Sequence, residues 1–276
     1  MRSASLLCVV CAALVTLAAP AHAADARQHV HASFLADVKT VKPGDVFDVG
    51  IFLQIDPDWH IYWENPGDSG SPTRATITAP PGVAVESMRY PLPEEFTQPG
   101  DIKGYGYTDE VMLIARVNVP PDWPRGKPIQ LTAQVSWLNC KDVCIPGKAV
   151  LELTVETGDQ NENANSSLFA KWHPRLPLRV KDRTVPLTVD GPVNDLKVRW
   201  NAPVKDVKVF PVPPEGVDVV SLDVSHADTT TTIKPVLRPL GGEKKPGAAL
   251  GLLITYEAEN GQRRGVRLSI PLQSGG

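Results

Sequence analysis

Apolar and polar residues alternate along much of this chain, with a period of two rather than 3.6. Alternation of this kind is typical of strands that bury one face. The alternating runs lie at residues 46–55, 110–119, 129–138, 149–155, 185–189, 196–200, 217–224, 230–237, 248–258 and 263–270. Turn-forming residues separate the runs, and the 27 prolines disfavour long helices. The sequence therefore predicts an all-β fold.

The composition changes sharply at residues 156–165, which are polar and nearly free of apolar side chains, as linkers are. Short strands at regular spacing on both sides of this segment are typical of immunoglobulin-like β-sandwiches. We therefore expect two immunoglobulin-like β-sandwich domains, at residues 24–157 and 178–276, joined by a linker at 158–177.

Two local signals add detail to this plan. Ser166–Trp172 is the one stretch expected to form a helix of any length, and His173-Pro174 should end it. Asn260-Gly261 separates the last two expected strands and predicts a tight hairpin turn.

The first residues have the pattern of a signal peptide. Arg2 precedes an apolar run at Leu6–Ala19, and Ala21-His22-Ala23 is a small-x-small cleavage site. The run is too short to span a membrane, which takes about 20 apolar residues, and no other stretch approaches that length. We therefore expect cleavage after Ala23, no membrane span in the mature chain, and export to a periplasm.

Charge and motif content exclude several classes of function. The net charge is −3, and no basic patch or run of like charges suggests binding to nucleic acid. The chain has no Gly-rich phosphate loop, no G-x-S-x-G and no H-E-x-x-H. We therefore expect no cofactor and no hydrolytic chemistry, and a protein or a small thiol as the partner.

Cys140 and Cys144 are the pair of cysteines expected to remain after cleavage, because Cys8 and Cys11 lie in the signal peptide. A disulfide between them closes a five-residue ring, which the chain-entropy model values at only about 2 kcal/mol. Such a bond is a poor staple and suits a reversible dithiol. A plain structural disulfide remains the alternative. Binding of Cu(I) by the two thiolates and His60 has less support, because no Met-rich or His-rich tract accompanies them.

Three ordered motifs carry a family resemblance. W-H-x-Y-W-x-N-P-G-D-S-G lies at residues 59–70, G-Y-G-Y at 104–107, and S-W-L-x-C-K-x-x-C-I-P-G-K at 136–148. Together they resemble the N-terminal domain of the DsbD family of periplasmic thiol:disulfide interchange proteins, in the branch related to copper-tolerance reductases. The resemblance covers roughly residues 24–155.

The resemblance implies an immunoglobulin-like domain whose cysteine pair shuttles electrons. By position in the motif, Cys144 would form the mixed disulfide with a partner and Cys140 would be the resolving thiol. The implied partners are thioredoxin-fold periplasmic proteins, with a membrane reductase in trans as electron source. The implied final substrates are disulfide isomerases or proteins of cytochrome c biogenesis.

The resemblance also implies a cap over the disulfide. Gly100–Tyr107 stands where the family has its cap loop, so Tyr105 and Tyr107 are the expected shielding aromatics. His60 and Tyr62 occupy positions that lie beside the cysteines in the family, where they could adjust the availability of the thiolate. A competing hypothesis is a non-catalytic binding or chaperone-like module in which the disulfide only closes a turn.

Overall fold

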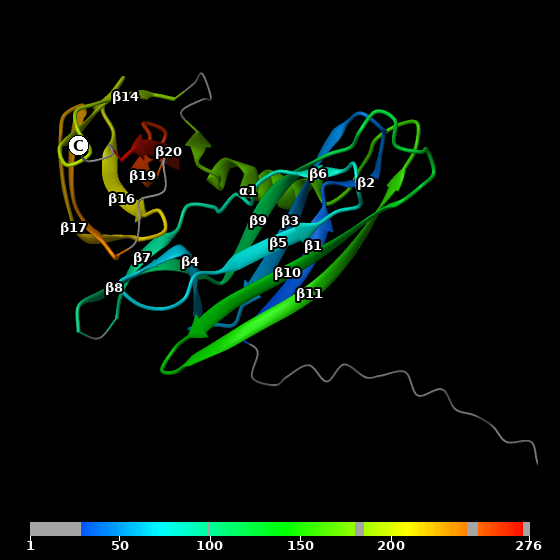
Figure 1. Ribbon diagram of the computed structural model, residues 1–276, viewed down its shortest axis with the longest axis horizontal. Coiled ribbons are helices and arrows are strands. Elements are labelled where there is room, and N and C mark those ends of the chain that lie inside the picture. Colours follow the sequence, from blue (N-terminus) through cyan, green and yellow to red (C-terminus); the bar gives the residue numbers. More distant parts are fainter. Residues whose placement is uncertain (1–28, 99, 180–184, 242–247, 273–276) are drawn as a thin grey trace, which may run out of the picture.

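The computed structural model describes residues 29–98, 100–179, 185–241 and 248–272. The expected signal peptide lies outside these residues. The described chain is built almost wholly of strands, so the predicted all-β fold is confirmed. The strands form two sandwiches that lie against each other, the second one drawn in yellow to red at the left of Figure 1.

The first sandwich contains two sheets. One has the order β1-β3-β9-β6; the other has the order β12-β2-β11-β10-β4-β8-β7, with β5 also paired to β10. Their strands are β1 (Val30–Ala36), β2 (Val38–Val41), β3 (Val46–Ile55), β4 (His60–Gly67), β5 (Arg74–Thr78), β6 (Ala84–Val85), β7 (Glu94–Gln98), β8 (Ile102–Thr108), β9 (Glu110–Asn118), β10 (Ile129–Cys140), β11 (Cys144–Thr157) and β12 (Glu162–Asn163).

The second sandwich also contains two sheets, with the orders β13-β20-β19-β16 and β14-β15-β18-β17. Their strands are β13 (Leu178–Arg179), β14 (Leu187–Asp190), β15 (Leu196–Trp200), β16 (Lys205–Val212), β17 (Val217–Ala227), β18 (Thr230–Pro239), β19 (Ala249–Glu257) and β20 (Arg263–Pro271). The hairpin turn predicted at Asn260-Gly261 joins the paired strands β19 and β20, and Gly261 supplies its positive φ of 74°.

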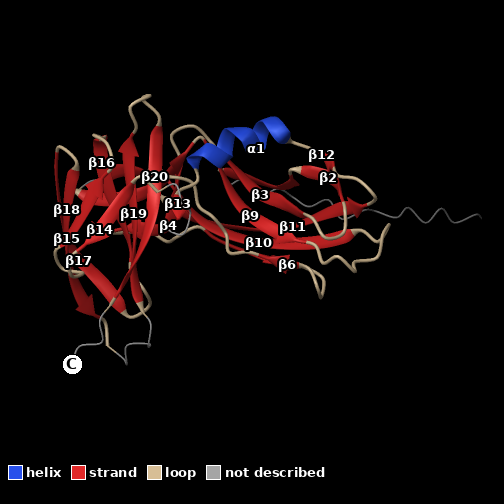
Figure 2. Cartoon of the chain, turned by 90° about the horizontal axis from the view of Figure 1, so that it is seen from above, coloured by secondary structure: helices blue, strands red, loops and turns tan. Residues whose placement is uncertain are grey.

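The segment between the sandwiches is packed rather than free. It holds α1 (Ser166–Trp172), at the predicted residues, and the 3-10 turn η1 (His173–Arg175). Phe169 and Trp172 are each only 2% exposed and belong to the core of the first sandwich. Figure 2 shows α1 lying over that sandwich. The expected linker at residues 158–177 therefore contributes to the first core, because α1 turns two aromatic side chains onto the sheet.

The sheet that contains β16, β19 and β20 is buried on both faces. Leu250, Leu252 and Ile254 of β19 point into the core of the second sandwich. Leu253 points the other way and joins the core of the first sandwich, together with Phe210 of β16. An unbroken apolar run such as residues 252–254 is typical of a strand that is covered on both sides. The second sandwich thus packs directly on the first.

Candidate functional site

The two cysteines end a long hairpin. Strands β10 and β11 pair without interruption from Ile129↔Val155 to Cys140↔Cys144. Cys140 and Cys144 are joined by a disulfide, with their Cα atoms 4.1 Å apart. The tip of this hairpin lies at the end of the first sandwich where β4 and the β7–β8 hairpin also lie (Figure 1).

The two sulfur-bearing residues differ in burial. Odd-numbered residues of β10, such as Val135 and Trp137, point into the core, so Cys140 points to the outer face of its sheet. Cys140 is nevertheless only 1% exposed, whereas Cys144 is exposed. An outer-face residue reaches such burial only when other side chains cover it. A cover therefore lies over one cysteine and leaves the other open to solvent.

His60 lies directly across from Cys140, because β4 pairs with β10 at these two residues. Directly paired residues share a face of the sheet, so the imidazole and the Cys140 sulfur project on the same side. The His60 ring packs on Phe96 at 4.4 Å between centroids and meets Tyr62 edge-on at 5.3 Å. Burial lowers the pKa of His60 below its usual value, so the imidazole is neutral near pH 7.

A small hydrogen-bond network lies on the face of the sheet that carries His60 and the disulfide. Gln98 Nε2 donates to the Tyr62 hydroxyl at 2.7 Å, and Ser69 Oγ donates to Gln98 Oε1 at 2.9 Å. A side chain at Gly70 would collide with the Tyr62 ring, because its Cβ would come within 2.4 Å of it. The network thus links the motif at residues 59–70 to the β7–β8 hairpin.

Phe96 lies across two glycines of the neighbouring strand. Strand β7 pairs Phe96 with Gly104 of β8, and β8 pairs Gly106 with Tyr62 of β4. A Cβ added to Gly104 would come within 2.2 Å of the Phe96 ring, and one added to Gly106 within 3.1 Å. These glycines therefore leave room for the Phe96 ring on the face of the sheet that carries the disulfide.

The structure corrects the expectation that Tyr105 and Tyr107 shield the disulfide. Tyr107 pairs with Ile61, the neighbour of His60 in β4, so both tyrosines point to the opposite face of the sheet. Tyr107 is 5% exposed and its hydroxyl donates to the Pro91 carbonyl at 2.8 Å. Tyr105 contacts Phe210 of the second sandwich, and burial, with nearby carboxylates, raises its pKa to about 12. The strand alternation thus assigns the shielding position to Phe96.

Four of the six predicted site residues therefore share one face: Cys140, Cys144, His60 and Tyr62. Among the residues that the structure describes, no group of three or more His, Cys, Asp or Glu side chains is arranged to hold a metal ion. Within the same residues, no helix has the length and apolar character needed to cross a membrane.

Comparison with known proteins identifies the first sandwich. The family "Thiol:disulfide interchange protein DsbD, N-terminal" matches residues 29–156, which include both cysteines and all three motifs. Residues 29–156 belong to the DsbD N-terminal domain family. The sandwich that carries the disulfide is therefore called the DsbD-type domain below. No curated protein shows significant sequence similarity to the chain.

Solved structures extend the likeness beyond the DsbD-type domain. The N-terminal periplasmic domain of ScsB from Proteus mirabilis aligns with 88% of this chain and 93% of its own, with a TM-score of 0.59 and 18% identity. At that identity the likeness concerns the fold, and it includes most of the second sandwich. The reduced N-terminal domain of DsbD from Neisseria meningitidis aligns with 49% of this chain and 90% of its own, with 15% identity and a TM-score of 0.27.

Sequence reasoning missed Phe96 and Gln98 as residues of the site. Both lie on short strand β7, which has few apolar residues and gives no clear period-two pattern. A usable signal was present in β8, where Gly104 and Gly106 alternate with Tyr105 and Tyr107. Alternate glycines leave one face of a strand bare, which indicates that another group lies across it.

Proposed function

We propose that this protein is a periplasmic thiol:disulfide interchange protein that relays electrons through Cys140 and Cys144. The observation that carries the proposal is the unequal burial of the two cysteines: Cys144 is exposed and Cys140 is 1% exposed. An incoming thiolate reaches the sulfur of Cys144 first. The membership of residues 29–156 in the DsbD N-terminal family supports the same chemistry.

The exchange runs in two steps. A thiolate of the partner attacks Cys144 Sγ, the Cys140–Cys144 bond breaks, and Cys140 leaves as a thiolate that takes a proton from solvent. The second thiolate of the partner then attacks the partner's own sulfur in the mixed disulfide and releases Cys144. Two electrons have moved to this protein, and the dithiol of the partner has become a disulfide. The reverse sequence reduces a substrate disulfide.

The fitting partners are thioredoxin-fold proteins, whose exposed cysteine pairs supply the two thiols of this scheme. A membrane reductase acting in trans is the electron source that the proposal implies, and disulfide isomerases or proteins of cytochrome c biogenesis are candidate substrates. His60 is proposed to assist proton transfer at Cys140. A neutral imidazole beside the leaving sulfur can hydrogen-bond to the thiol and exchange a proton with it.

The test is to trap the intermediate in the full-length mature protein. Cys140→Ala should accumulate a mixed disulfide with an oxidised thioredoxin-fold protein, because Cys144 can attack the disulfide of that protein and the variant has no Cys140 thiol to complete its reduction. Cys144→Ala should trap far less, because the Cys140 sulfur is covered. Gel shift under non-reducing conditions and mass spectrometry of the linked peptides measure both. If neither variant traps a partner, the relay is rejected.

The competing function is a binding or chaperone-like module with a structural disulfide. The hairpin register argues against it, because eleven consecutive residue pairs besides Cys140↔Cys144 already hold β10 against β11. The reduction potential discriminates between the two functions. Structural disulfides lie below about −300 mV, whereas a relay must be reducible by thioredoxin-like donors.

A further inference from the structure

The second sandwich presents one row of side chains to the DsbD-type domain. Phe210 of β16 pairs with Leu253 of β19, which pairs with Arg267 of β20, so all three share a face. Arg263 and Gly265 lie on the same face of β20, four and two residues before Arg267. We refer to these five residues as the interdomain face.

The interdomain face meets the β7–β8 hairpin on the side opposite the disulfide. The Phe210 ring is fully buried, 5.0 Å from Tyr105 of β8 and 6.0 Å from Trp63 of β4, in edge-to-face geometry with both. On the other side of the same hairpin, Phe96 packs on His60 next to the disulfide. One thin hairpin thus separates Phe210 from Phe96.

The interdomain face also contacts the residues that lead into the β7–β8 hairpin. The guanidinium of Arg263 donates to the carbonyl of Pro93, the residue that precedes β7. Gly265 packs so closely on Leu92 that a Cβ there would come within 2.4 Å of its side chain. The chain that leads into β7 is therefore fixed by the second sandwich as well.

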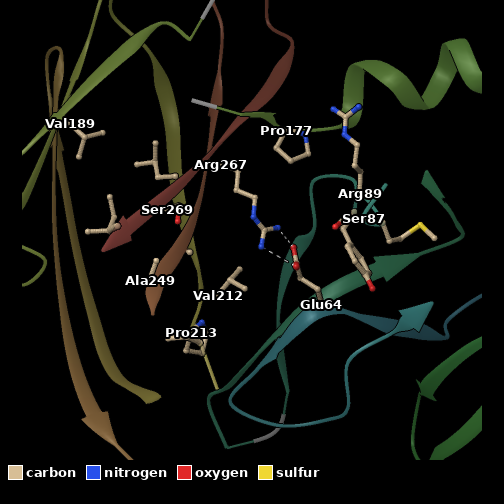
Figure 3. Close-up of a pocket in the computed structure, with 16 residues that line it drawn as sticks. Glu64, Ser87, Arg89, Pro177, Val189, Val212, Pro213, Ala249, Arg267 and Ser269 are labelled. Carbon is tan, nitrogen blue, oxygen red and sulfur yellow. Dashed lines mark hydrogen bonds and ion pairs between the residues drawn. The ribbon is translucent and has the colours of Figure 1, made fainter. Parts of the chain in front are cut away.

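The adjacent strand β4 is attached in the same way. Figure 3 shows Arg267 reaching across the cleft between the sandwiches to form a two-pronged ion pair with Glu64. Asn65 Nδ2 donates to the Pro211 carbonyl at 2.6 Å. Cavities of about 820 and about 510 Å³, each lined by both sandwiches, flank these contacts. The cavities flank the strip of direct contact behind β4 and the hairpin.

Within its own domain the hairpin is held by the buried Tyr107 side chain, by the hydrogen bonds of Gln98 and by a short stretch of strand pairing. Strand β7 is the last strand of its sheet, and β8 pairs with β4 only at residues 60–62 before the register shifts at Gly67. A two-stranded edge hairpin is marginally stable by itself and depends on packing against other elements. The packing that it has on the side away from the disulfide comes in large part from the interdomain face.

We propose that the second sandwich is a brace that holds the β7–β8 hairpin over the disulfide, with Phe210 as the positioning residue that acts through Phe96. The proposal rests on the proposed thiol:disulfide function and assigns the second sandwich a part in it. Phe210 touches neither sulfur nor partner. Its effect is to limit how often the hairpin opens and exposes Cys140 and the inner side of the disulfide.

The experiment measures the rate at which dithiothreitol reduces the disulfide in the full-length mature protein. Phe210→Ala should increase this rate about two- to tenfold, the range that corresponds to losing the aromatic contacts of one ring. Phe210→Leu, which keeps apolar volume behind Tyr105, should restore most of the slow rate. Ile233→Ala is the matched control, since Ile233 is buried in the second sandwich's own core and lies away from the interdomain face.

A double-mutant cycle tests whether Phe210 acts through Phe96. Phe96→Ala alone should accelerate reduction, and adding Phe210→Ala should then change the rate little, because the shield is already gone. The brace is rejected if Phe210→Ala reduces at the wild-type rate, if the two effects multiply, or if Ile233→Ala accelerates reduction equally. The proposed function is tested separately by the mixed disulfide of Cys140→Ala, which does not depend on Phe210. A trapped partner with no Phe210 effect would therefore reject the brace alone.

Discussion

His60 of β4 and Cys140 of β10 are directly paired across the sheet, and their side chains leave it on the same side. Burial lowers the pKa of His60, which means that the folded protein disfavours the imidazolium. The unfolded chain binds this proton at a higher pH than the folded chain does. Acidification through the unfolded pKa of about 6.5 therefore lowers the free energy of unfolding. This loss of stability is complete below the lowered pKa of the folded state.

We predict that His60→Gln weakens this pH dependence. The difference in urea midpoint between pH 7.5 and pH 5.5 should be smaller in His60→Gln than in the wild type. His31→Gln is the matched control, because the His31 side chain is 71% exposed. It should retain the wild-type difference. Equal pH dependence in all three proteins would show that burial of His60 does not penalise its charged form.

A second prediction follows from the unequal burial of the cysteines. After reduction, Cys144 should react with iodoacetamide at least about tenfold faster than Cys140, since alkylation needs an accessible thiolate. Peptide mass spectrometry at short reaction times measures the two rates in one sample. Each single Cys→Ala variant provides a control in which only one thiol can react. Equal rates at Cys140 and Cys144 would contradict the covered state of Cys140.

The third prediction concerns the shield itself. Phe96→Ala should accelerate reduction of the disulfide by dithiothreitol, because it removes the ring that packs on His60 beside Cys140. Gly104→Ala should act in the same direction, because the added Cβ would enter the space that the Phe96 ring occupies. Phe52→Ala is the control. It also deletes a partly buried aromatic ring, but one that lies in the other sheet of the same domain. Acceleration by Phe52→Ala alone would refute the assignment.

The sequence predicted the strands whose two faces meet different surroundings. Residues 129–138 and 196–200 alternate clearly, and the structure has strands there. Strand β16 at residues 205–212 was missed, because Val209 faces the second core while Phe210 faces the DsbD-type domain. Burial on both sides removes the local period, and β16 lacks the long apolar run by which β19 was predicted.

The site residues, like the strands, could be predicted only in part from the sequence. Cys140, Cys144, His60 and Tyr62 were found from motif and resemblance, and strand pairing places them on one face. Tyr105 was assigned to the shield because Gly100–Tyr107 stands where the family has its cap loop. In the structure Gly104 and Gly106 lie in a regular strand, where they make room for an aromatic ring. Which face a strand residue occupies depends on register, and register is set by partners far along the chain.

The last prediction concerns the extent of the DsbD-type domain, for which residues 24–157 were expected. Phe169 and Trp172 of α1 are buried in its core, and a side chain at Gly50 would come within 3.3 Å of the Phe169 ring. We therefore propose that the domain continues through residue 177. Phe169→Ala in the full chain should lower the free energy of unfolding by about 3–5 kcal/mol, the usual cost of emptying an aromatic core position.

Two fragments test the same boundary. A fragment of residues 24–177 should fold, form the Cys140–Cys144 disulfide and unfold cooperatively, whereas residues 24–158 should be much less stable because the Phe169 and Trp172 rings are absent. Circular dichroism melts of both fragments measure this difference. Because the fragment to 177 lacks Phe210, its disulfide should also be reduced by dithiothreitol faster than that of the full chain, at a temperature where both are folded. If the fragment to 158 is as stable as the fragment to 177, α1 is an accessory to the domain and the boundary lies at the end of β11.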